Sequence, residues 1–146
     1  MISLDANILV YAADLDAGER HARAQDVVRR ASNSYAGLTE QSLFEFFHAS
    51  TRKSKMSYAE AAVTMRDLLQ SFVLLLPPQT IVEDTLALRD RNNLSVWDSR
   101  LLAVCAAHGC GHLLSEDLQD GAQYGGVTVV NPFNPANARL IGRLLS

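Results

Sequence analysis

The chain has 146 residues, of which 48% are hydrophobic and 20% charged, and its formal net charge at pH 7 is −3. These values exclude a disordered chain and predict one folded domain over residues 1–146, while the charge gives no sign of a nucleic-acid-binding protein. No apolar run approaches the roughly 20 residues that cross a bilayer, and the N-terminus lacks the pattern of a signal peptide, so we expect a cytoplasmic protein without membrane contact.

The first third of the chain predicts two strands and three helices. A short strand over residues 2–4 leads into a helix over residues 7–12, and a second helix has its apolar side chains at helical spacing over residues 20–32. A strand follows over residues 34–38. Thr39 is a typical N-cap for a helix that runs to about residue 52, so strand and helix alternate from the start.

The middle of the chain continues the alternation. Ser57 and Glu60 are spaced as a capping box, which predicts a helix that runs to about residue 70. The apolar run at residues 73–76 predicts a buried strand that ends before two prolines. The next helix is expected over residues 80–92.

The last third adds two strands and two helices. Ser95 repeats the capping pattern at the start of a helix that ends at Gly109, and strands follow over residues 112–114 and 127–130. A terminal helix over residues 134–145 begins with Asn134 as its N-cap. About five short strands that alternate with helices are typical of an α/β fold with a mainly parallel sheet.

Four carboxylates lie where the ends of these elements would bring them together. Asp5 ends the first strand, Asp117 follows the fourth strand, Asp98 lies in the first turn of a helix, and Glu45 follows the second strand by a turn and a half of helix. Parallel sheets bind ligands beyond the carboxyl ends of their strands, where the strand order reverses. Taken singly, each residue also fits an ordinary role as a helix cap, a turn residue or a solvent-facing helix residue.

A converging set of carboxylates needs cations or protons to offset its repulsion. Each close pair at about 5 Å repels by roughly 3 kcal/mol at an effective dielectric near 20. Mg²⁺ and Mn²⁺ prefer oxygen ligands, and such ions can activate water and hold phosphate oxygens. The pattern therefore predicts a divalent-metal site that acts on a phosphate ester, and the bound cations would offset the acidity of the pocket.

Four segments that contain these carboxylates make the chain resemble the PIN-domain family, and in particular the VapC-type toxins of VapBC toxin–antitoxin pairs. The segments follow one another in order over nearly the whole chain, at residues 4–7, 43–47, 96–102 and 113–121. The last segment, Leu-Leu-Ser-Glu-Asp-Leu-Gln-Asp-Gly, is the most specific, together with Ala106, Gly109 and Cys110 ahead of it.

The resemblance implies a three-layer α/β/α fold and a Mg²⁺- or Mn²⁺-dependent endoribonuclease that leaves 3′-hydroxyl and 5′-phosphate ends. It also implies a homodimer and a VapB-type antitoxin that places a basic residue in the acidic groove. The catalytic, metal-binding residues correspond to Asp5, Glu45, Asp98 and Asp117, and two polar residues would support them, Asn7 and Ser115. Taken alone, Asn7 equally fits a helix start and Ser115 a turn.

The sequence leaves the fourth carboxylate open and departs from the family in two positions. Glu116 and Asp120 both lie close enough to Asp117 to replace it, and Glu40 competes with Glu45. Ser99 stands where the family usually has Ala. Arg100 stands where an apolar residue is common, and it is expected to pair with a carboxylate or meet a substrate phosphate.

Three side observations favour ordinary packing. Trp97, beside a helix start, is more typical of a buried side chain than of a base-stacking one. The apolar group over residues 43–47 fits the core better than a partner interface. Cys105 and Cys110 lack the spacing of a zinc site and are expected to be buried thiols.

Three alternative functions remain at this stage. A phosphotransferase or phosphatase with an aspartyl nucleophile would need DxD, whereas the chain has Asp5-Ala6-Asn7. A receiver-like signalling module would need a late lysine, and none follows Lys55. A non-catalytic, RNA-binding PIN-like domain would be favoured by a broken carboxylate set, and this set is whole.

Overall fold

The computed structural model describes residues 1–52 and 55–146, and within them six strands form one sheet. The strands are β1 (Ile2–Leu4), β2 (Ala36–Thr39), β3 (Val73–Leu75), β4 (His112–Leu114), β5 (Gln123–Tyr124) and β6 (Val127–Val130). Their order is β3-β2-β1-β4-β6-β5, and all neighbours are parallel except β5 and β6. The predicted α/β class with a mainly parallel sheet is confirmed.

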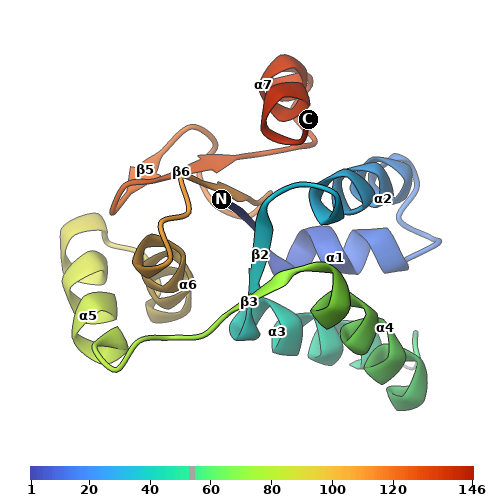
Figure 1. The fold of residues 1–146 in the computed structure, drawn as a ribbon, viewed down its shortest axis with the longest axis horizontal. Coiled ribbons are helices and arrows are strands. Elements are labelled where there is room, and N and C mark those ends of the chain that lie inside the picture. The colour runs from blue at the N-terminus through green and yellow to red at the C-terminus, as the bar shows by residue number, and fades with distance from the viewer. Residues whose placement is uncertain (53–54) are drawn as a thin grey trace.

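Helices cover both faces of this sheet (Figure 1). They are α1 (Ala6–Ala13), α2 (Glu19–Ser32), α3 (Glu40–Thr51), α4 (Tyr58–Ser71), α5 (Ile81–Asn92), α6 (Val96–Ala107) and α7 (Ala138–Leu144), with a 3₁₀ turn, η2 (Pro135–Asn137), before α7. One buried cluster joins the sheet to α1, α2, α3 and α7, and a second joins it to α5 and α6. The three-layer arrangement is therefore present. No helix in the described ranges is long and apolar enough to cross a membrane.

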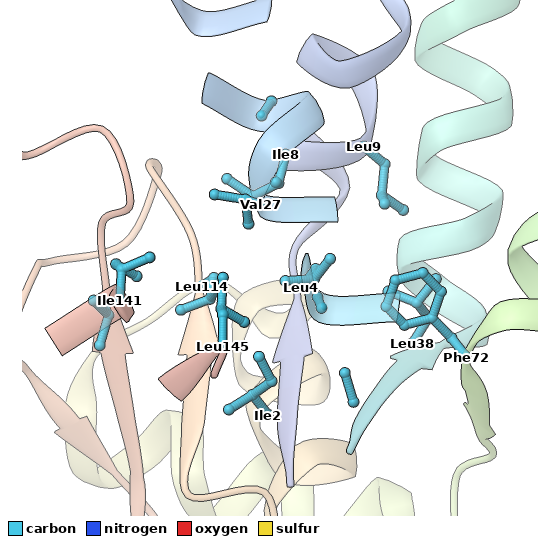
Figure 2. Close-up of a cluster of buried hydrophobic side chains, with 14 of the residues drawn as sticks. Ile2, Leu4, Ile8, Leu9, Val27, Leu38, Phe72, Leu114, Ile141 and Leu145 are labelled. Atoms are coloured by element: carbon cyan, nitrogen blue, oxygen red, sulfur yellow. The ribbon is translucent and has the colours of Figure 1, made fainter. Parts of the chain in front are cut away.

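The central strands bury side chains on both faces, as parallel strands between helices must. Leu38, Leu4 and Leu114 lie across three adjacent strands and face α1 and α3 (Figure 2). The alternate residue Leu113 points to the other layer, where it packs in one cluster with Leu102 of α6. This two-sided core fixes the strands whose carboxyl ends carry the candidate site.

The outer elements differ from the expectations. The strand at residues 73–76 is not a buried one, because β3 is the edge of the sheet and Val73 is 45% exposed. The sheet also has a sixth strand, β5, which has two residues and joins β6 through Gly125 and Gly126, both at positive φ. The helix expected over residues 134–145 is divided into η2 and α7.

Candidate functional site

The site lies where β1 and β4 end side by side. The backbone N–H of Asp5 donates to the carbonyl of Leu114 at 2.9 Å, and that of Ser115 donates to Val130 at 3.1 Å. The chain runs from β1 outward to β2 and β3, and then returns to the other side of β1 with β4. The order therefore reverses between β1 and β4, where such sheets bind their ligands.

Asp5 is both the N-cap of α1 and the most buried carboxylate of the site. Its Oδ1 accepts from the N–H of Ala6 at 2.7 Å and its Oδ2 from the hydroxyl of Ser115 at 2.7 Å, and the residue is 7% exposed. Burial is the main cause that raises its pKa to about 6. The hydrogen bonds from Ser115 and Ala6 lower the pKa, and the negative charges of Glu45 and Asp117 raise it further. Asp5 thus carries a charge that its surroundings do not neutralise.

Asn7 links Asp5 to Asp117. Its amide Nδ2 lies 3.3 Å from Oδ2 of Asp5, 3.0 Å from Oδ2 of Asp117 and 3.4 Å from the hydroxyl of Ser115. The N–H of Asp117 also donates to that hydroxyl, at 3.2 Å. The structure therefore brings together four of the six predicted site residues, on the loops that follow β1 and β4.

Glu45, on α3, contributes to the raised pKa of Asp5, whereas no hydrogen bond among the described residues links the Asp98 side chain, on α6, to the other site residues. The amide Nε2 of Gln41 donates at 3.0 Å both to Oε1 of Glu45 and to the backbone carbonyl of Trp97, the neighbour of Asp98. Asp98 lies in the first turn of α6, and its N–H donates to Ser95 at 3.1 Å. The sequence does not single out Gln41 as a site residue, although it precedes Glu45 by one helical turn on the same polar stripe.

The three competing carboxylates are engaged elsewhere. Oε1 of Glu116 accepts from Nε and Nη2 of Arg20 at 2.9 and 2.6 Å, which lowers the pKa of this carboxyl. Asp120 accepts from the N–H of Asn131 and from the side chains of the two asparagines at residues 134 and 137. Glu40 pairs with Arg100, one of the two partners expected for that arginine.

The carboxylate oxygens of the predicted site residues are chemically suited to bind a hard divalent cation. Within the described ranges, no Lys or Arg side chain pairs with Asp5, Glu45, Asp98 or Asp117. Carboxylates without cationic partners are the ligands that Mg²⁺ and Mn²⁺ prefer. In the same part of the chain, however, no three His, Cys, Asp or Glu side chains converge closely enough to hold an ion together.

Three expectations about other side chains have different outcomes. Trp97 is not buried: it is 62% exposed beside Glu45 and Gln41. Of the apolar group in α3, Leu43 and Phe46 are buried, whereas Phe44 is exposed. Cys105 and Cys110 are buried free thiols, as expected.

The comparisons with known proteins agree with this fold. The model of the PIN domain matches residues 2–119, a range that contains all the predicted site residues. No curated protein sequence matches the chain.

Solved structures of similar fold include the following three from bacteria. A toxin–antitoxin complex from Klebsiella pneumoniae contains a chain with 26% identity and a TM-score of 0.67, over 91% of this chain and 98% of that one. The toxin VapC20 of Mycobacterium tuberculosis, which cleaves the sarcin–ricin loop, has 18% identity and a TM-score of 0.62 over 80% and 90%. VapBC2 of Rickettsia felis, bound to a DNA fragment from its promoter, has 14% identity and a TM-score of 0.65 over 90% and 98%.

Proposed function

This chain belongs to the PIN-domain family, and we propose that it is the endoribonuclease toxin of a type II toxin–antitoxin pair. The observation that carries the proposal is the buried carboxylate of Asp5 at the reversal of strand order, with Asp117 and Glu45 close enough to raise its pKa. The structural likeness to VapC20, a toxin that cleaves RNA, supports the same activity.

The proposed cofactor is Mg²⁺ or Mn²⁺, held by Asp5, Glu45, Asp98 and Asp117. A cation there would offset the buried charge of Asp5, for which the described residues supply no Lys or Arg partner. Glu45 and Asp117 are exposed, so their side chains have room to turn from Gln41 and Asn7 towards an ion when it binds. When bound, such an ion lowers the pKa of water and stabilises the charge of a phosphodiester under attack.

The polar residues of the site would hold these carboxylates in place. Ser115 donates to Asp5, and Asn7 bridges Asp5 and Asp117, so each keeps a carboxylate oriented between rounds of hydrolysis. Gln41 does the same for Glu45. These are positioning roles, because each residue acts on substrate only through a carboxylate.

Cleavage of RNA by the purified chain tests the proposal. We expect single-stranded RNA to be cut in Mg²⁺ or Mn²⁺, and not in EDTA, with 5′-phosphate ends on the products. Asp5→Asn and Asp98→Asn each remove one negative charge from the site, so each should lower the rate by about 100-fold or more.

Asp90→Asn is the matched control, because Asp90 is an exposed carboxylate of α5 outside the site. Its rate should equal that of the unmodified chain. Cleavage that survives EDTA or Asp98→Asn contradicts the metal mechanism. RNA binding without any cleavage would favour the non-catalytic alternative instead.

The proposed partner is an antitoxin. Toxin–antitoxin complexes stand among the similar structures. The chain has an apolar groove of about 760 Å³ between α1, α2, α3 and α4, which includes Leu9, Val28, Phe46 and Leu68 and suits the apolar face of a partner helix.

We expect the partner's gene to lie beside the gene of this chain, and its product to suppress the cleavage. Val28→Glu should weaken that complex, whereas Val63→Glu, on α4 outside the groove, should not.

We also propose a homodimer. Exposed apolar side chains run from the edge strand β3 into α5, at Val73, Leu74, Leu76, Val82 and Leu86. An edge strand with apolar neighbours is a surface that folded proteins usually cover. A second copy of the chain is the occupant that the family resemblance implies.

A further inference from the structure

An open pocket with two aromatic walls lies beside one of the proposed catalytic carboxylates. It measures about 480 Å³ and is lined by Glu40, Gln41, Phe44, Glu45, Trp97 and Arg100, from α3 and α6. Phe44 is 65% exposed and Trp97 is 62% exposed. The carboxylate of Glu45, one of the proposed catalytic groups, belongs to the same pocket.

The polar side of the pocket is held in place by its own hydrogen bonds. Gln41 is buried, and its Nε2 donates to Glu45 and to the carbonyl of Trp97 while its Oε1 accepts from Nη1 of Arg100 at 2.9 Å. Nη2 of Arg100 donates to Glu40. Both protons of the Gln41 amide are therefore used within the protein, which leaves no free amide donor to identify a particular base.

The charge of the pocket favours a neutral ring over a phosphate. Arg100 is paired with Glu40, so the charge that remains is the negative one of Glu45. Within the described part of the chain, neither the Trp97 nor the Phe44 ring stacks on another aromatic side chain. Two open aromatic faces beside a negative charge suit a nucleobase, because every base has a face that stacks on an aromatic ring.

We propose that this pocket binds an unpaired nucleobase of the RNA, stacked on Trp97 with Phe44 as the second wall. The inference rests on the proposed ribonuclease function and adds a substrate subsite to it. The base adjoins Glu45, so the subsite orients the nucleotide next to the phosphodiester that is cut. Recognition through stacking tolerates all four bases and favours those that stack most strongly.

Tryptophan fluorescence tests the subsite without reference to cleavage, because Trp97 is the single tryptophan of the chain. The experiment uses the full chain with Asp5→Asn to prevent hydrolysis, and titrates it with short oligoadenylate and oligouridylate. Stacking should quench the Trp97 emission. Affinity, measured by the anisotropy of labelled oligonucleotide, should fall roughly 5- to 150-fold in Trp97→Ala and less in Trp97→Phe, which keeps an aromatic face.

Tyr35→Ala is the matched control, since Tyr35 is an exposed aromatic residue next to the opposite, amino end of β2. It should leave both quenching and affinity unchanged. Quenching of Trp97 in the Asp5→Asn chain, together with weaker oligonucleotide binding in Trp97→Ala, supports the subsite. This holds even if the unmodified chain cuts no RNA, because the absence of cleavage would refute only the catalytic proposal.

Three results would overturn the subsite. In the first, the unmodified chain cleaves RNA and binds oligonucleotides, but binding does not change the Trp97 emission, and Trp97→Ala binds with unchanged affinity. The second is the absence of oligonucleotide binding in every variant. The third is a change of oligomeric state in Trp97→Ala by sedimentation, which would assign Trp97 to a contact between two copies of the chain.

Discussion

Asp5 carries two roles that are usually found on separate residues. As the N-cap of α1 it satisfies the N–H of Ala6, and as a buried carboxylate it faces Asp117 through Asn7. A neutral Asn or Ser would cap the helix equally well. The charge at this position therefore costs stability, and a cation that binds there would restore it.

The pH dependence of stability should reveal this cost in the metal-free protein. The pKa of Asp5 is about 6 in the folded chain against an ordinary value of 3.8, which corresponds to about 3 kcal/mol. Because the folded pKa is the higher one, the folded state binds the proton more tightly. The contribution of Asp5 to the free energy of unfolding should therefore rise as the pH falls from 7 through 6 towards 4.

Asp5→Asn isolates that contribution in urea titrations. The variant should be more stable than the unmodified chain by about 1 to 3 kcal/mol at pH 7 in EDTA, with the difference shrinking towards pH 4. Addition of Mg²⁺ should stabilise the unmodified chain and leave the variant unchanged. A difference that does not vary with pH would refute the raised pKa.

The loop after β4 allows the fourth carboxylate to be tested by neighbouring substitutions. Asp117 shares Asn7 with Asp5, whereas Glu116 is bound by Arg20. Asp117→Asn should lower Mg²⁺-dependent cleavage at least about 10-fold, because it removes a charge from the site. Glu116→Gln should change the rate less than about 3-fold. The reverse order of effects would move the fourth ligand to Glu116.

At the scale of elements, local capping signals were reliable and burial was not. Thr39, Ser57 and Ser95 each accept a hydrogen bond from the third residue of the helix they were predicted to start, and Ser57 and Glu60 form the full capping box. These bonds join residues three apart, so the sequence alone contains both partners. The burial of β3 was predicted wrongly, because it depends on what lies across the sheet.

The division of the terminal helix has a long-range cause at Asp120. Burial raises the pKa of Asp120, but the hydrogen bonds from Asn131, Asn134 and Asn137 outweigh it, and the pKa is lowered. These bonds hold residues 131–137 in a turn before α7 begins. Asp120 is thus a structural residue rather than a ligand of the site.

Asp120→Ala should destabilise the fold by about 1 to 3 kcal/mol, since it removes the hydrogen bonds that Asn131, Asn134 and Asn137 donate to a charged acceptor. Thermal unfolding measures the loss, and Asp90→Ala, at an exposed carboxylate of α5, provides the matched control with a change within about 0.5 kcal/mol. Cleavage activity at a temperature where the variant is folded should be retained. A stable but inactive variant would return Asp120 to the list of candidate ligands.

At the scale of the whole molecule, β3 and α5 together form an exposed apolar surface. Val82 of α5 is 70% exposed and Leu76 follows the edge strand, so the surface is apolar on both elements. Val82→Asp and Leu76→Asp should convert the proposed dimer to a monomer in light scattering or sedimentation, because each buries a charge at the contact. Val63→Asp, on α4, should leave the dimer intact. A monomeric unmodified chain would refute the proposal.

The sequence by itself determined the alternation of strands and helices, the helix starts and the placement of Asp5 and Asp98 at element ends. Each depends on residues that are neighbours along the chain. Only the tertiary structure decided which carboxylates meet, because β1 and β4 are more than a hundred residues apart and their pairing fixes Asn7 between Asp5 and Asp117. It also decided that Arg20 pairs with Glu116. Trp97 is exposed beside Glu45, because the exposure of a side chain depends on the elements that pack around it.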